Sequence, residues 1–333
     1  MHQPDVLVTG SAGHLGHALM LELPRRGYTP IGLDIKESHH TTHIGSVSDR
    51  PLIAAIFAEH PSLRHVLHTA TLHKPHVGSH PKDAFVATNI QGTLVLLEEA
   101  SKSGKIEAFI FTSTTSTFGA ALAPKPGEPA AWIDESVVPI PKNICGTTKV
   151  AAEDLCQLVH NETKMPVLVL KTSRFFPEQD DNEVARQTYS DDNLKVNELT
   201  YRRADIADVV DAHICAIRKA KVLGWGKYNI SAPPPFQRTT EILRDLDVDA
   251  AEVIKTTCPK EAENLVSIGW RLPARIDRVY DSSKAIEDLD WKPVYTFARA
   301  VARVIDKQEW RSPLTLAVGK RGYHAIPTDV YTS

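Results

Sequence analysis

The sequence of 333 residues has few cysteines and no paired cysteine motif. Its four cysteines, Cys145, Cys156, Cys215 and Cys258, are scattered without a C-x-x-C pair, which argues against a disulfide framework or a structural zinc site. No apolar run approaches the roughly 20 residues that span a bilayer. A strand is expected almost at the N-terminus, which leaves no room for a secretory signal. We therefore expect no membrane segment, reduced thiols and a cytoplasmic location.

Excess charge of one sign is also missing. The chain has 38 basic and 41 acidic residues, a net charge near −3, so we expect neither nucleic acid nor an anionic membrane as a partner. A small-molecule ligand is the expected partner. Histidines cluster within 39–43 and within 73–80, but neither group has the carboxylate and helical spacing of a metal-hydrolase motif. We expect no metal.

Short β-branched runs alternate with helical patterns in the first half of the chain. This alternation is typical of an α/β fold in which helices cover both faces of a parallel sheet. Strands are expected at 5–9, 29–34, 65–68, 108–112 and 167–171, and helices at 14–26, 84–102 and 146–160. In the helix at 84–102, the periodicity predicts that one face packs on the sheet, formed by Val86, Ile90, Leu94, Leu97 and Ala100.

The regular alternation fades beyond residue 172. Helices are still expected near 206–220 and 239–246, among Pro-rich and charged loops. This half is expected to face the substrate. The tail after Trp310 is polar and irregular, which suits a lid, an oligomer arm or a disordered segment.

A glycine-rich turn follows the first expected strand. Gly10, Gly13 and Gly16 stand at regular intervals between that strand and its helix. The first two let the backbone turn tightly and approach a pyrophosphate, and Gly16 permits close packing of helix on strand. The helix N-terminus offers N–H donors and a positive dipole end to phosphates. The residues expected to bind a dinucleotide here are Gly10, Ala12, Gly13, His14, Leu15 and Gly16.

An acidic residue ends the second expected strand. Asp34 follows the turn by about twenty residues, where a carboxylate accepts hydrogen bonds from an adenosine ribose. It would repel a 2′-phosphate, so NAD is expected rather than NADP. Lys36, close in sequence, is a cation that would suit NADP instead.

The turn at 9–16 and the acid at Asp34 resemble those of the extended short-chain dehydrogenase/reductase family, especially its NAD-dependent sugar-nucleotide epimerases and dehydratases. The likeness covers most of the chain. It implies a Rossmann-type doubly wound parallel sheet with a smaller C-terminal substrate-binding lobe. We expect an NAD-binding domain at 1–172, with a return segment near 201–230, and mainly the substrate lobe and tail at 173–333. The resemblance also implies a homodimer.

Further segments resemble cofactor-binding positions of this family. The segment 68–71 resembles the strand end that passes under the cofactor, and His73 matches a basic residue that reaches the pyrophosphate. A Gly-Asp step usually contacts the adenine, but Gly45 is followed here by serine. Asn89 begins an N-x-x-G-T motif whose amide holds the sheet near the active site. The contacts implied are Ser46, Val47, Thr69, Ala70, Thr71, His73, Asn89, Thr112 and Phe175.

The stretch 111–119 resembles the strand end that carries the family's catalytic Ser or Thr. Its closing aromatic-Gly pair selects Thr114, with Ser113 and Thr115 as close alternatives. A hydroxyl at this strand end can orient a substrate alcohol or carbonyl for hydride transfer. Thr114 and Thr115 are therefore also expected to contact substrate.

The family's acid/base is a Tyr four residues before a Lys, and the matching residues here are Cys145 and Lys149. The spacing places both on one helix face, and Lys149 would bind the nicotinamide ribose. A thiol extends roughly 4 Å less than a phenol, whereas proton transfer needs heavy atoms within about 3.2 Å. We therefore expect that Cys145 does not reach the usual substrate oxygen, although a thiol could ionise beside Lys149. Either a water or another residue replaces the phenol, the chemistry differs, or the change silences the enzyme.

Arginines in the second half suit phosphate groups of a substrate. The expected substrate contacts are Arg203 and Arg271, with Arg202, Arg275 and Arg278 as further cations. A dehydratase would usually have Asp-Glu directly after the catalytic Thr, where this chain has Thr115 and Ser116. The predicted function is an NAD-dependent epimerase or oxidoreductase of a sugar or sugar nucleotide, altered at Cys145. The alternatives are an oxidoreductase or isomerase of a non-sugar natural product and an NAD-binding sensor or scaffold without turnover.

Overall fold

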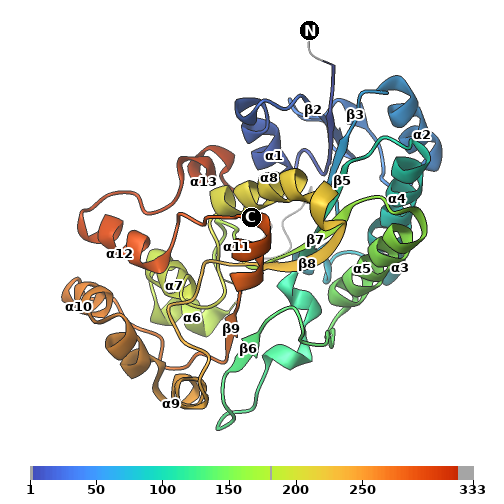
Figure 1. The fold of residues 1–333 in the computed structure, drawn as a ribbon. Coiled ribbons are helices and arrows are strands. Elements are labelled where there is room, and N and C mark those ends of the chain that lie inside the picture. Colours follow the sequence, from blue (N-terminus) through green and yellow to red (C-terminus); the bar gives the residue numbers. More distant parts are fainter. Residues whose placement is uncertain (1–2, 181, 322–333) are drawn as a thin grey trace.

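The computed structural model describes residues 3–180 and 182–321 (Figure 1). Its centre is a parallel sheet of seven strands in the order β3-β2-β1-β4-β5-β7-β8. The predicted α/β class with a doubly wound parallel sheet is therefore confirmed. The strands are β1 (Val6–Thr9), β2 (Pro30–Asp34), β3 (His43–Ile44), β4 (His65–His68), β5 (Ala108–Thr114), β7 (Val167–Thr172) and β8 (Trp225–Ile230).

The sheet grows outward from β1 in both directions. β1 pairs with β2 on one side and with β4 on the other, and every pair in the sheet is parallel. The strand order reverses between β1 and β4, which opens a crevice at their carboxyl ends. The glycine-rich turn follows β1 and lies at this crevice.

Helices cover both faces of the sheet. Two buried clusters, one on each face, account for the nearly continuous apolar character of the strands. On one face lie α1 (His14–Glu22), α8 (Ile206–Leu223), α11 (Ser283–Leu289) and α13 (Pro313–Val318). On the other lie α2 (Arg50–Glu59), α4 (Gly92–Lys102) and α5 (Ile144–Thr163) (Figure 1).

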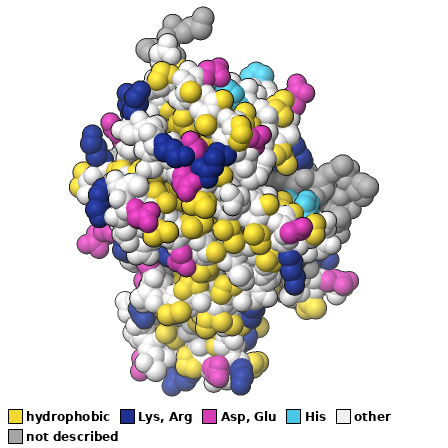
Figure 2. Space-filling view, turned by 90° about the vertical axis from the view of Figure 1, so that its right-hand side faces the viewer, with side chains coloured by type: hydrophobic (Ala, Val, Ile, Leu, Met, Phe, Trp, Pro, Cys, Tyr) yellow, Lys and Arg dark blue, Asp and Glu magenta, His cyan; other side chains and the backbone are white. Residues whose placement is uncertain are grey.

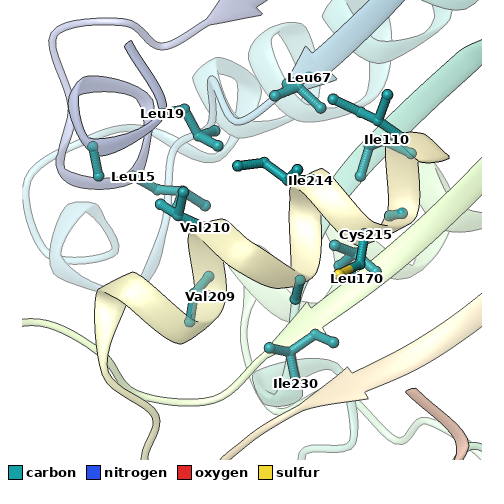
Figure 3. Packing of buried hydrophobic residues seen from close by; sticks show 14 of the residues in the cluster. Leu15, Leu19, Leu67, Ile110, Leu170, Val209, Val210, Ile214, Cys215 and Ile230 are labelled. Atoms are coloured by element: carbon teal, nitrogen blue, oxygen red, sulfur yellow. The ribbon is translucent and has the colours of Figure 1, made fainter. Parts of the chain in front are cut away.

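Helix α8 is the main packing element of the first face. Its side chains Val210 and Ile214 point toward Leu15 and Leu19 of α1 and toward the strands (Figure 3). The cluster includes residues from five strands, among them Leu67, Ile110, Leu170 and Ile230. The chain returns to the sheet through α8 and β8. Both lie within 201–230, the segment near which a return to the NAD-binding domain was expected.

The helix expected at 14–26 is shorter than predicted. α1 ends at Glu22, and a separate 3-10 turn spans Pro24–Arg26. Proline has no backbone N–H and its ring clashes with the carbonyl one turn earlier, so the α-helix stops before Pro24.

The helix expected at 84–102 contains a π-helical turn. α3 (Lys82–Phe85) leads into the π-helical segment Val86–Gln91, which continues as α4. The wider turn changes which side chains face the sheet, so Phe85 and Asn89 are buried while Val86 is 45% exposed. The prediction that Val86 packs on the sheet was wrong for this reason. Leu97 and Ala100 are buried as expected.

A smaller lobe contains most of the remaining chain. Its third buried cluster joins several helices to a two-stranded parallel sheet of β6 (Ala131–Ile133) and β9 (Arg278–Tyr280). The helix expected at 239–246 extends further, with non-helical backbone at Asp249, because Ala250 and Ile254 also enter this cluster. The helices are α6 (Glu183–Thr188), α7 (Asp191–Glu198), α9 (Thr240–Thr257), α10 (Pro259–Ser267) and α12 (Phe297–Ile305).

The chain after Trp310 is more regular than expected. α13 begins at Pro313, with Ser312 as its N-cap, and buries Leu314 and Val318 in the same cluster as α1 and α8. The rest of the tail, from residue 322, lies outside the described residues. Within residues 3–180 and 182–321, no helix combines the length and the apolar character needed to cross a membrane.

Candidate active site

A cavity of about 420 Å³ lies at the carboxyl ends of the central strands. Its size is in the range of small-molecule sites. The lining comes from the turn after β1, the ends of β2, β4, β5 and β7, and the start of α5. Of the residues predicted for the site, all but Asn89, Arg203 and Arg271 line it: Gly10, Ala12, Gly13, His14, Leu15, Gly16, Asp34, Ser46, Val47, Thr69, Ala70, Thr71, His73, Thr112, Thr114, Thr115, Cys145, Lys149 and Phe175.

The glycine turn is tightly packed where it enters the cavity. Gly10 has φ +74°, and a Cβ there would lie 2.8 Å from the backbone nitrogen of Ala70. A Cβ on Gly16 would lie 1.9 Å from the carbonyl oxygen of Gly10. Gly13 is the N-cap of α1 and has no side chain to accept from the first amides of the helix. The turn therefore fits the pyrophosphate of a dinucleotide, which the helix N-terminus can bind.

Asp34, the last residue of β2, lines one end of the cavity. Its carboxylate accepts hydrogen bonds from Ala12 N at 3.0 Å and from Lys36 N at 2.9 Å. These bonds fix the carboxylate beside the glycine turn, where it can accept from ribose hydroxyls. Ser46 and Val47 line the same end, and the Ser46 hydroxyl pairs with Ser48 at 2.8 Å.

A buried contact between a histidine and a glutamate crosses the cavity wall. His14 Nε2 lies 2.9 Å from a carboxylate oxygen of Glu178, and both side chains are almost fully buried. The contact joins the first turn of α1 to the segment after β7. Sequence reasoning missed Glu178, Tyr280 and Arg174 as lining residues. Glu178 directly follows the Phe-Phe-Pro stretch after a sheet strand, which is the signal that could have pointed to it.

Ser113 and Thr114 end β5 and Thr115 follows it, and the surroundings of their hydroxyls differ. The Ser113 hydroxyl is buried and donates to Glu153 at 2.6 Å. Thr114 Oγ1 accepts from Ser116 N at 3.1 Å, and its side chain is only half-buried at the cavity. Thr115 is buried but also lines the cavity. This arrangement favours Thr114 over Ser113, because the Ser113 hydroxyl is engaged with a buried carboxylate.

Lys149 is buried and lines the cavity. Its ammonium donates to the carbonyl of Thr112 at 2.7 Å and lies 4.4 Å from the centre of the Phe111 ring. Burial lowers the pKa of Lys149 to about 8, although the nearby thiols and Glu153 act in the opposite direction. The contact with Thr112 fixes the amine at the end of β5, next to Thr114.

Cys145 lies one turn before Lys149 on the same buried face of α5. Its side chain is 1% exposed and lines the cavity. Burial raises the pKa of the Cys145 thiol, and the smaller effect of Lys149 in the other direction does not cancel it. The hypothesis that Lys149 promotes ionisation of this thiol is therefore not supported. A neutral thiol is a poor general base and a poor nucleophile near neutral pH.

Asn89 supports the site from outside the cavity. Its amide oxygen accepts from Leu72 N and Thr71 Oγ1, both at 2.9 Å. The amide nitrogen donates to Leu72 O at 2.8 Å and to Thr148 Oγ1 at 2.9 Å. One buried side chain thus connects the segment after β4 with α5.

The arginines of the second half are arranged differently from the expectation. Arg203 is buried, lies 2.7 Å from Glu198 and does not line the cavity. Arg271 is exposed and also lies outside the lining. Arg202 and Arg278 line the cavity instead. The pKa of the Glu198 carboxyl is lowered, despite its burial, by the guanidinium groups of Arg202, Arg203 and Arg174.

Comparison with known proteins assigns the chain to a family. Residues 6–231 match the NAD dependent epimerase/dehydratase family. The chain belongs to this family. Membership confirms the family resemblance seen in the sequence and the prediction of NAD as cofactor, since the family is NAD dependent.

Curated members of the family match this chain over different lengths. A UDP-glucose 4-epimerase from Rhizobium meliloti is 33% identical over 162 residues, which is 46% of each chain. The match therefore spans about half the length of that relative. A dTDP-glucose 4,6-dehydratase from Xanthomonas campestris pv. campestris is 26% identical and covers 90% of this chain and 92% of its own.

Solved structures of epimerases share the fold. A UDP-glucose 4-epimerase from Thermotoga maritima, determined with UDP-glucose, has a TM-score of 0.61 at 22% identity and covers 91% of this chain and 97% of its own. A UDP-glucose 4-epimerase from Thermus thermophilus, determined with NAD, has a TM-score of 0.61 at 21% identity and covers 91% of this chain and 98% of its own.

Proposed function

We propose that this chain is an NAD-dependent epimerase or oxidoreductase of a sugar nucleotide, with acid/base chemistry altered at Cys145. The observation that carries the proposal is that Thr114, Cys145 and Lys149 line one cavity with the glycine turn and Asp34. The cofactor turn and the family's catalytic positions thus meet in one site. Family membership and relatives named for UDP-glucose and dTDP-glucose support the substrate class.

The residues of the cavity suit distinct parts of NAD. The amides at the start of α1 would bind the pyrophosphate, Asp34 the adenosine ribose, and Lys149 the nicotinamide ribose. NAD, when bound, supplies a hydride acceptor and donor. Thr114 would orient the substrate hydroxyl, since its own hydroxyl lies at the open end of β5. On the substrate side, Arg202 and Arg278 are the cations placed to attract phosphate groups.

Cys145 stands, in this proposal, where the family has its catalytic tyrosine. The buried thiol stays protonated near neutral pH and does not extend as far as a phenol. Proton transfer from the substrate hydroxyl must then pass through a water or another cavity residue, and turnover is slower by about 10² to 10⁴. The absence of Asp-Glu after Thr114 in the sequence favours epimerisation over elimination.

The experiment measures interconversion of UDP-glucose and UDP-galactose and the absorbance of reduced nicotinamide in the NAD-loaded protein. The wild type is compared with Cys145→Tyr and with Cys145→Phe, which matches the added ring without the hydroxyl. Gain of activity in Cys145→Tyr alone supports the proposal. Equal activity in the wild type and both variants would place the proton path elsewhere.

Absence of activity in the wild type and both variants, with NAD still bound, would overturn the proposal of a sugar-nucleotide reaction. A panel of dTDP-sugars and non-sugar alcohols then separates the second candidate, an enzyme of another natural product, from a binding protein without turnover. The buried, protonated Cys145 is the observation that favours this binding role.

We also propose that two copies associate through the face that carries α4 and α5. Figure 2 faces this side and shows apolar side chains gathered over it. The exposed Val86 and Leu158 come from neighbouring elements there, and Ile90 and Leu94 are only half-buried. Light scattering after chromatography tests this: Leu158→Arg should shift a dimer to a monomer, whereas Val248→Arg on α9 should not. A monomeric wild type would refute the proposal.

A further inference from the structure

Two histidines outside the cavity face each other near the edge of the sheet. His43 lies in the edge strand β3, and His60 is the C-cap residue of α2. Their Nε2 atoms are 3.1 Å apart, and their ring planes meet at 74°. A carboxylate oxygen of Glu59 lies 3.7 Å from His60 Nε2. One ligand atom from each of the three residues lies within 4.8 Å of the others.

We propose that His43, Glu59 and His60 bind a divalent transition metal of the zinc type. Zn²⁺ takes imidazole nitrogen and carboxylate oxygen at about 2.0–2.2 Å, so neighbouring ligand atoms of a tetrahedral site lie roughly 3.3 Å apart. The separations of 3.1 Å and 3.7 Å lie on either side of this value. Small side-chain rotations bring the three atoms to one centre, and a water completes the tetrahedron.

The chemistry of the donors also suits a cation. Two neutral imidazoles that face each other through Nε2 make one hydrogen bond and use one lone pair. A cation between them engages both lone pairs. The carboxylate of Glu59 supplies negative charge, and its side chain is 64% exposed, so the metal can enter from solvent. Imidazole nitrogen with carboxylate oxygen is a common donor set for zinc, nickel and copper.

The site differs from the histidine groups that the sequence suggests. His39 and His40 lie close to His43 in the chain, but their rings pack against each other and His40 packs against His17. His43 instead meets two residues from the end of α2, which no local spacing reveals. Among the residues that the structure describes, this is the one cluster with three such donors in reach.

A metal at this position would hold the shortest strand of the sheet in place. β3 has two residues, and His43 pairs with Leu33 of β2. Gly45, which follows β3, donates its backbone N–H to the carbonyl of Asp34 at 2.9 Å. A bound metal would tie β3 to the end of α2, and it would stabilise the folded protein because the unfolded chain does not hold the three donors together.

Isothermal titration calorimetry with Zn²⁺ on the full-length, tag-free, metal-stripped protein tests the proposal. We expect one equivalent to bind, a rise in melting temperature with added Zn²⁺, and visible absorption bands of a tetrahedral site with Co²⁺. His43→Gln and His60→Gln should each weaken binding at least tenfold. His39→Gln, in the neighbouring exposed loop, is the matched control and should bind like the wild type.

The Glu59→Gln variant separates loss of a metal ligand from loss of folding, because this side chain is mostly exposed and its replacement should leave the fold intact. It should keep the melting temperature of the metal-free protein and lose Zn²⁺ affinity. Absence of a one-equivalent site in the wild type would overturn the proposal, and so would equal affinity in His60→Gln. The outcome does not depend on NAD binding or turnover, since no ligand of the metal lines the cavity.

Discussion

The amide of Asn89 donates a hydrogen bond to Thr148 Oγ1 at 2.9 Å and thereby ties the π-helical turn to the helix that carries Cys145 and Lys149. The same amide nitrogen also bonds to the carbonyl of Leu72. The π-helical turn is what brings Asn89 to the buried side, where an uninterrupted α-helix would present a different residue. Asn89 thus helps to hold α5 against the segment after β4.

Replacing Asn89 should destabilise the protein and weaken NAD binding together. Asn89→Leu removes four hydrogen bonds and leaves the backbone N–H of Leu72 without its acceptor. We expect the free energy of unfolding to fall by about 2 to 4 kcal/mol, measured by urea denaturation. Gln91→Leu, at an exposed position of the same turn, should change it by less than about 0.5 kcal/mol. Equal effects of the two variants would contradict this role.

Asp34 should set the preference for NAD over NADP. Asp34→Asn keeps a hydrogen-bond acceptor for Ala12 N but removes the charge that would repel a 2′-phosphate. We expect the ratio of NADP to NAD dissociation constants to fall at least about tenfold, measured by calorimetry with both dinucleotides. Glu37→Gln, which removes an exposed charge nearby, serves as the control. An unchanged ratio in Asp34→Asn would show that selectivity lies elsewhere.

Gly16 should tolerate no side chain. A methyl group there would lie 1.9 Å from the carbonyl oxygen of Gly10, which belongs to the backbone and cannot turn away. Gly16→Ala should therefore abolish NAD binding and lower the melting temperature by several degrees, about 4 °C or more. Gly78→Ala is the matched control, because a Cβ there meets no atom within 4 Å. Thermal melts with and without NAD give the comparison, and normal NAD affinity in Gly16→Ala would refute the packing argument.

The buried Lys149 should make stability depend on pH in a defined direction. Its pKa falls from 10.5 to about 8 on burial, so between these values the unfolded chain binds more protons than the folded one. The free energy of unfolding, relative to that of a Lys149→Met variant, is therefore lowest below pH 8. It rises as the pH increases from about 8 to 10.5. The gain should reach at most about 3 kcal/mol. Denaturant unfolding of both proteins at pH 7 and pH 10 measures this gain. A free-energy difference between the two proteins that falls with pH would contradict the prediction.

Local patterns were sufficient to predict the main sheet and its glycine turn. The strands ending at Thr9, Asp34 and His68 follow from short apolar runs, and the spacing of the glycines follows from steric needs within a few residues. Parallel pairing then brings the ends of distant strands together, which is why most predicted site residues share one cavity.

Features that depend on which partners a side chain finds in the folded chain were not predictable. Arg203 is directed away from the cavity by its pairing with Glu198 and the carbonyl of Phe176. The exposure of Val86 depends on a single π-helical turn, and α13 is ordered by the apolar surface of α1 and α8. In each case the residue type permits several environments, and tertiary contacts select one.

β8 is synthesised long after its partner strand β7, and this separation matters while the chain is being made. β8 pairs along the whole of β7, from Val167 with Trp225 to Thr172 with Ile230. A nascent chain that has emerged only to residue 172 therefore exposes the outer edge of β7, and an open edge of a sheet invites pairing with other chains. During translation of residues 172 to 230, the outer edge of β7 is thus open to pairing with other chains.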